Sequence, residues 1–171
     1  MPRITLVAVA LALTISARVT SAGIADSPLP VLSAGATTLH LYSVPGVING
    51  GNISTFFLCT STDTAPQQVA VEVFPYPGGA PCNDAAAESF NVLPGATARF
   101  GTGGPSNDIL GGLGLSSTIA CGLSANGGSA RILSTSKKLV CTAFAGDRFN
   151  IPPQTTWQLT IIAKLKQKAA N

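Results

Sequence analysis

The stretch TTWQLTIIAKL, residues 155–165, carries the clearest structural signal in the chain. Apolar and polar side chains alternate along it: Trp157, Leu159, Ile161, Ala163 and Leu165 fall on one face, and Gln158, Thr160, Ile162 and Lys164 fall on the other. Successive side chains of a β-strand point to opposite faces of the sheet. The pattern therefore predicts a strand with one face turned to a hydrophobic core.

Working outward from this stretch, similar patterns recur along the chain. The segments are TTLHLYSV (37–44), STFFLCTST (54–62), QVAVEVF (68–74), SFNVL (89–93), ATARFGT (96–102), STIACGL (117–123), SARILST (129–135) and KLVCTAFAG (138–146). Their number and their spacing are typical of a Greek-key sandwich. We predict an all-β, immunoglobulin-like Greek-key β-sandwich of about 7–9 strands, preceded by a signal peptide.

The composition supports one domain of this class. The chain has 171 residues, 46% of them hydrophobic and 10% charged, with 18 glycines and 12 prolines. This is too apolar for a disordered chain and too rich in turn residues for a helical one. The length suits a single domain with a real core.

The N-terminus is typical of an export signal. Arg3 precedes an apolar run at residues 4–17, and small residues follow. We predict a signal peptide over 1–25, cut after Ala22 or Ala25, with an uncleaved anchor as the alternative. The predicted remainder is an N-terminal linker (26–35), a sandwich domain (36–165) and a basic C-terminal tail (166–171). The mature chain would then be secreted (extracellular, periplasmic or at the cell surface), with no transmembrane segment.

Four cysteines in an exported chain predict two disulfides. Three pairings are possible, and strand parity places Cys59 and Cys141 on inward faces. We expect Cys59–Cys141 to cross the core and Cys82–Cys121 to tie a loop. The spacings contain no C-x-x-C pair and no Cys/His cluster, so no metal site is predicted.

The motifs of catalysis are weak. Ser134 and Lys137 have the S-x-x-K spacing of serine acyl-enzymes, but they lie between two strand-like runs, and "TSKK" suits a hairpin turn. The single histidine, His40, is expected on the outer face of its strand, in parity with Thr38 and Tyr42. We predict no catalytic residues and no cofactor. A calcium site built from Asp63, Asp84 and Asp108 across loops stays open.

Charge is segregated along the sequence. Residues 26–130 hold six acidic residues and one basic one, whereas residues 131–171 hold seven basic residues and one acidic one. Lys137, Lys138, Lys164, Lys166 and Lys168 are candidate contacts for an anionic surface, a glycan or the acidic part of another copy. The alternative is that these lysines only protect a solvated edge. No aromatic residues are interleaved with them, which argues against nucleic acid.

The segments STFFLCTSTDTAPQQVAVEVF, NVLPGATARFGT, GSARILSTSKKLVCTAF and AKLKQKAAN resemble a group of small, uncharacterised secreted bacterial proteins. That group is similar to immunoglobulin-like β-sandwiches, and the resemblance covers residues 36–171. It implies an exported bacterial sandwich and carries no catalytic residues to transfer. Fold alone does not assign function.

Two functions follow as hypotheses. The first is a non-enzymatic secreted or cell-surface binding or structural module stabilised by disulfides. The alternative is a small secreted hydrolase that uses loop carboxylates such as Asp84, Glu88 or Asp108.

Overall fold

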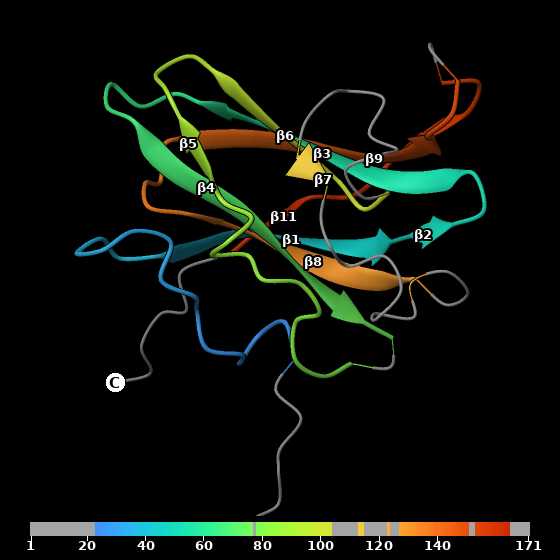
Figure 1. Cartoon of the computed structure of the whole chain (residues 1–171), viewed down its shortest axis with the longest axis horizontal. Coiled ribbons are helices and arrows are strands. Elements are labelled where there is room, and N and C mark those ends of the chain that lie inside the picture. Colours follow the sequence, from blue (N-terminus) through green and yellow to red (C-terminus); the bar gives the residue numbers. More distant parts are fainter. Residues whose placement is uncertain are drawn as a thin grey trace, which may run out of the picture.

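The computed structural model describes residues 23–76, 78–103, 113–114, 123, 127–150 and 153–164. Its elements within these ranges are eleven strands, which form two sheets that enclose a common core (Figure 1). The predicted all-β class is therefore confirmed. The predicted strand over 117–123 lies outside the described residues, except for the buried Leu123.

The first sheet, sheet A, has the strand order β11-β1-β8-β4-β5, and every neighbouring pair in it is antiparallel. Its strands are β1 (Leu39–Val47), β4 (Gln67–Pro75), β5 (Phe90–Val92), β8 (Gly128–Ser134) and β11 (Ile162–Ala163). The centre of this sheet is the pairing of β8 with β1 on one side and with β4 on the other.

The second sheet, sheet B, has the order β10-β9-β3-β6-β7, with β2 also paired to β3. Its strands are β2 (Asn49–Gly50), β3 (Ile53–Ser61), β6 (Thr97–Gly101), β7 (Leu113–Gly114), β9 (Leu139–Asp147) and β10 (Thr156–Gln158). Only β6 and β7 run parallel to each other. The longest pairing joins β3 and β9 in unbroken register from Ile53 opposite Asp147 to Ser61 opposite Leu139.

Alternation along the central strands builds the core. Val69, Val71 and Val73 of β4 point inward and are fully buried. Phe57 and Cys59 of β3 meet them from sheet B in the same apolar cluster. Burial of a valine or phenylalanine side chain contributes about 1.5–3 kcal/mol, so these facing strands hold the two layers together.

The outer face of sheet A is covered as well. Leu32 packs with Ala70 of β4, Leu133 of β8 and Ala85 in a second apolar cluster. Leu32 belongs to the segment 26–35, for which the sequence predicts a linker. The segment follows this face of the sheet, and Ser27 in it is also buried.

The stretch 155–165 does not form one strand, so this prediction is wrong. Trp157 pairs with Ala145 in sheet B, whereas Ala163 pairs with Tyr42 in sheet A. Between them Leu159 and Ile161 pack against the core while the backbone crosses from one sheet to the other. Trp157 and Ala163, also predicted to face inward, are exposed. Alternation therefore identified the inward side chains only in the middle of the stretch, and it does not specify which sheet the backbone joins.

The predicted outer face of the first strand also needs correction. The register of β1 shifts between His40 and Tyr42, and this β-bulge breaks the alternation. Tyr42 therefore packs against the core, and Thr38 is buried. His40 is half-buried, and its Nε2–H lies 3.1 Å from the carbonyl oxygen of Tyr42.

Candidate binding site at the edge of β9

One side of β9 is only partly covered. Its inner neighbour, β3, pairs with it along its whole length, but on the other side β10 pairs only with Phe144, Ala145 and Gly146. One further bond, from Leu159 N–H to Ala143 C=O (2.9 Å), ends the contact. The first half of β9 therefore has no neighbouring strand on this side among the described residues.

The backbone groups of Cys141 point to this open side. In an antiparallel ladder, hydrogen-bonding groups of alternate residues point to opposite neighbours. Asp147 N–H bonds to Thr155 C=O and Ala143 C=O accepts from Leu159, so the odd-numbered residues of β9 face β10. Cys141 follows the same alternation, and within the described residues its N–H and C=O have no partner. An unpaired strand edge is a template for another strand.

A groove lies at this point, where the chain turns away from β9. Cys141 and Thr142 form one wall, and residues 158–161 form the other, around a hollow of about 430 Å³. Two large apolar side chains on the strands beside it are exposed, Val140 of β9 (61%) and Trp157 of β10 (51%), although neither lines the hollow. Backbone hydrogen-bonding groups and exposed apolar side chains are the two features that an added strand uses.

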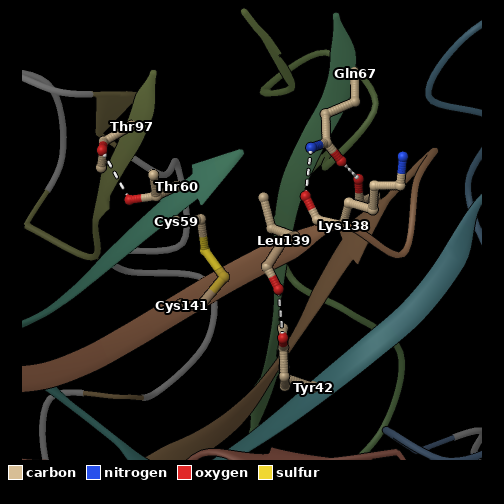
Figure 2. Close-up of a disulfide and its surroundings, with 9 residues drawn as sticks. Tyr42, Cys59, Thr60, Gln67, Thr97, Lys138, Leu139 and Cys141 are labelled. Carbon is tan, nitrogen blue, oxygen red and sulfur yellow. Dashed lines mark hydrogen bonds between the residues drawn. A yellow bond between two sulfur atoms is a disulfide. The ribbon is translucent and has the colours of Figure 1, made fainter. Parts of the chain in front are cut away.

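The disulfide stands directly behind this edge. Cys59 and Cys141 are opposite each other in the β3–β9 ladder, with their Cα atoms 4.1 Å apart (Figure 2). The sequence predicts this pairing, and Cys121 of the other predicted pair, Cys82–Cys121, lies outside the described residues. The expectation that the bridge crosses the core is wrong, because the two cysteines belong to neighbouring strands of sheet B and both lie on its inward face. The bridge ties the open strand to the fully paired β3.

Two more contacts fix the start of β9. The hydroxyl of Tyr42 in sheet A donates to Leu139 C=O (2.5 Å), and the side-chain amide of Gln67 donates to Lys138 C=O (2.9 Å) (Figure 2). Both donors come from the opposite sheet. These two bonds tie the start of β9 to sheet A.

The two edges of sheet A are partly covered by the chain itself. Beyond the short β5, Asn83 takes the place of a strand along β4, accepting from Val73 N–H (2.8 Å) and donating to Val71 C=O (2.9 Å). On the far side of sheet A, β11 and the bond from Lys164 N–H to Leu41 C=O (2.9 Å) cover part of β1, and Pro45 lacks an N–H group. A proline on an edge strand discourages further pairing.

The lysines predicted to contact an anionic surface are only partly described, since Lys166 and Lys168 lie outside the described residues. Lys137 and Lys138 lie exposed in the connection from β8 to β9, and Lys164 is exposed at the end of β11. Lys138 forms an ion pair with Asp63 (3.2 Å). Folding therefore reduces the charge segregation seen in the sequence, because a basic residue of the segment 131–171 pairs with an acidic residue of the segment 26–130.

The S-x-x-K motif lies in a turn, as predicted. Ser134 ends β8 and is fully buried, and its hydroxyl donates to the side-chain oxygen of Gln67 (2.6 Å). Lys137 is exposed. The turn is not a hairpin, however, because β8 belongs to sheet A and β9 to sheet B, so the connection passes between the layers.

The loop carboxylates of the hydrolase hypothesis have structural partners. Asp84 accepts the N–H groups of Ala86 and Ala87 (both 3.1 Å), and Glu88 accepts from the side chain of Asn83 (2.8 Å). Asp108 lies outside the described residues. No group of three or more His, Cys, Asp or Glu side chains that could hold a metal ion occurs in the described part of the chain.

Sequence reasoning missed the β9 edge because it depends on where β10 leaves the sheet. No signal in the sequence marks this point, because the alternation continues unchanged through Thr160 and Ile161, where the backbone crosses between the sheets.

Comparisons with protein-family models, with curated proteins and with solved structures found no match to this chain. In the described ranges, no helix has the length and apolar character needed to cross a membrane.

Proposed function

We propose that the chain is an exported, non-enzymatic binding module that captures an extended segment of another protein by strand addition to β9. The observation that carries the proposal is the groove beside Cys141, where the N–H and C=O of that residue have no partner among the described residues. An extended peptide satisfies both groups at once, whereas a glycan or a flat anionic surface does not require a strand edge.

Export is supported by the disulfide, since such bonds persist in oxidising compartments outside the cytosol. The apolar run at 4–17 after Arg3 supports the same conclusion. A bridge between the recognition strand and its neighbour suits a module that must keep one binding edge in place outside the cell.

We further propose that the sandwich is immunoglobulin-like. In that fold, strands B, E and D lie side by side in one sheet and C, F and G in the other. The orders β1-β8-β4 and β3-β9-β10 correspond to these six strands in sequence and in space. The disulfide joins the positions of C and F, whereas the conserved bridge of antibody domains joins B and F across the core.

Amide hydrogen exchange tests the open edge directly. We expect Cys141 N–H to exchange rapidly in the free protein, while the neighbouring N–H groups of Val140 and Thr142, which face β3, are protected. Slow exchange at Cys141 in the free, monomeric protein would show that the edge is already covered and would contradict the proposal.

The partner can be sought with a display library of random linear peptides, selected on the oxidised protein. Peptides bound as an added strand should slow the exchange of Cys141 N–H. The variant Thr160→Trp, which fills the groove, should lose binding, whereas Ala87→Trp, on an exposed turn near sheet A, should retain it. Equal loss in both variants, or binding that leaves Cys141 unchanged, would place the site elsewhere.

A further inference from the structure

The segment at the start of the described chain is held by a buried cation. Arg131 on β8 is 1% exposed and points to the outer face of sheet A. Its Nη1 donates to Ser27 C=O (2.9 Å) and to Ile24 C=O (3.4 Å), and its Nη2 donates to Pro28 C=O (2.8 Å). The backbone of residues 24–28 is thus bound through its carbonyl groups, and this contact does not depend on which side chains the segment carries.

A tight turn begins at Gly23. The carbonyl of Gly23 accepts from Ser27 N–H (3.0 Å) and from Asp26 N–H (3.3 Å). In the other direction, the nitrogen of Gly23 donates to the carboxylate of Asp26 at 2.6 Å. Gly23 therefore has hydrogen bonds on both its N–H and its C=O groups, and all of them lie within the turn.

We propose that the mature protein begins at Gly23, whose α-ammonium group forms an ion pair with Asp26. The reaction is hydrolysis of the peptide bond between Ala22 and Gly23 by a signal peptidase. Water supplies a hydroxyl to the Ala22 carbonyl carbon and a proton to the Gly23 nitrogen, and the new carboxylic acid then gives up its proton as the amine takes one up to become the ammonium group. This inference rests on the proposed export.

The position of Asp26 favours a chain that begins at Gly23. The nitrogen that already donates to the Asp26 carboxylate would become a positively charged amine, so the same contact would join two opposite charges. The folded mature chain would then keep the turn and add an ion pair to it.

A cut after Ala25, which the sequence alone leaves open, has the opposite effect. It removes the Gly23 carbonyl that accepts from the buried Ser27, and it removes the Ile24 carbonyl from Arg131. A buried N–H group without a partner and the loss of one acceptor of Arg131 both destabilise the docked segment.

The primary test is export of the full chain from a secreting bacterial host, followed by N-terminal sequencing and intact-mass analysis. We expect the sequence Gly-Ile-Ala-Asp-Ser. A secreted protein that begins at Asp26, or at any other residue, overturns this inference and leaves export intact. A chain that keeps Met1 and stays in the cell overturns both.

A second measurement tests the ion pair. Chains that begin at Gly23 and at Asp26 are produced directly, and their urea midpoints are compared. We expect a higher midpoint for the Gly23 chain, and Asp26→Asn should lower it in that chain but not in the shorter one. Equal midpoints for the two unsubstituted chains would show that the turn does not stabilise the fold and would overturn the ion pair, whereas the start at Gly23 is decided by N-terminal sequencing.

Discussion

At the scale of single residues, Arg131 shows how a charge is kept inside this small sandwich. Its Nε meets the carboxylate of Glu72, its other nitrogens donate to backbone carbonyls, and its guanidinium lies 5.2 Å from the ring centre of Phe74. Glu72 is 3% exposed. Two charges can be buried only when each compensates the other and the remaining donors are used.

Removing one partner should therefore be costly. We expect Arg131→Met to reduce the free energy of unfolding by about 3–5 kcal/mol, since it leaves Glu72 as an unpaired buried charge. The double variant Arg131→Met with Glu72→Gln should recover part of this loss. Urea unfolding followed by fluorescence measures both, and an equal or larger loss in the double variant would show that the uncompensated charge is not the cause.

His40 predicts a dependence on pH. Partial burial, together with the nearby charges of Lys164 and Arg131, lowers the pKa of His40 from 6.5 to about 4. The unfolded chain therefore takes up a proton at a higher pH than the folded one, and stability should fall as the pH falls from about 6.5 to about 4.

The variant His40→Gln isolates this effect. Its free energy of unfolding should change less between pH 6.5 and pH 4.5 than that of the unsubstituted protein. Asp63 adds little in this window. Its hydrogen bonds from Ser136 and Thr64 and its contact with Lys138 lower its pKa from 3.8 to about 2, so its effect on stability changes mainly below the window. The same slope in both proteins would assign the pH dependence to other groups.

At the scale of elements, the β3–β9 pair is the axis of sheet B. The disulfide closes a loop of 82 residues within a ladder that is already in unbroken register. The bridge should act mainly on the unfolded chain. Closing a loop of this length lowers the conformational entropy of that chain and so raises its free energy by about 4 kcal/mol.

We expect the double variant Cys59→Ala with Cys141→Ala to lose about 2–4 kcal/mol of stability, measured by thermal and urea unfolding. A control is the neighbouring pair Thr60 and Thr97, whose hydroxyls are 2.9 Å apart at the surface. Changing both to valine should cost less than about 1 kcal/mol. If both double variants lose the same stability, the bridge adds nothing beyond an ordinary cross-strand contact.

A strand could be predicted from the sequence where one alternating pattern lies within a single strand of a single sheet. Val69, Val71 and Val73 alternate within a strand that is paired on both sides, and the predicted range 68–74 matches β4 closely. Pattern was insufficient where the backbone changes partner without changing its alternation, as at Leu159 and Ile161. The bulge in β1 misled the placement of Tyr42 for a related reason, because one extra residue reverses the faces that follow it.

The candidate site was less accessible to prediction than the fold. Parity predicts that Cys59 and Cys141 both face inward, but the open backbone of Cys141 depends on the lack of a neighbouring strand there among the described residues. Long-range pairing of this kind leaves no mark in local sequence. The binding of residues 24–28 by Arg131 could not be predicted from the sequence either, because Arg131 binds backbone carbonyl groups, which every residue type carries.

For the whole molecule, folding mixes charges that the sequence keeps apart. Arg131 meets Glu72 and Lys138 meets Asp63, so two basic residues of the second part are compensated within the same chain. Such pairs reduce the field that one copy presents to another. An attractive head-to-tail contact between copies is correspondingly weakened.

We therefore expect the oxidised mature protein to remain a monomer from low to high salt, as measured by light scattering at several protein concentrations. Assemblies that form at low salt and dissolve as screening rises would show that Lys137, Lys164 and the tail lysines outweigh the internal pairs. Assemblies that grow with concentration but ignore salt would have a different origin, because strand addition uses backbone hydrogen bonds and apolar contacts. In that case Thr160→Trp should restore the monomer, and the segment that β9 accepts would come from a second copy of this chain.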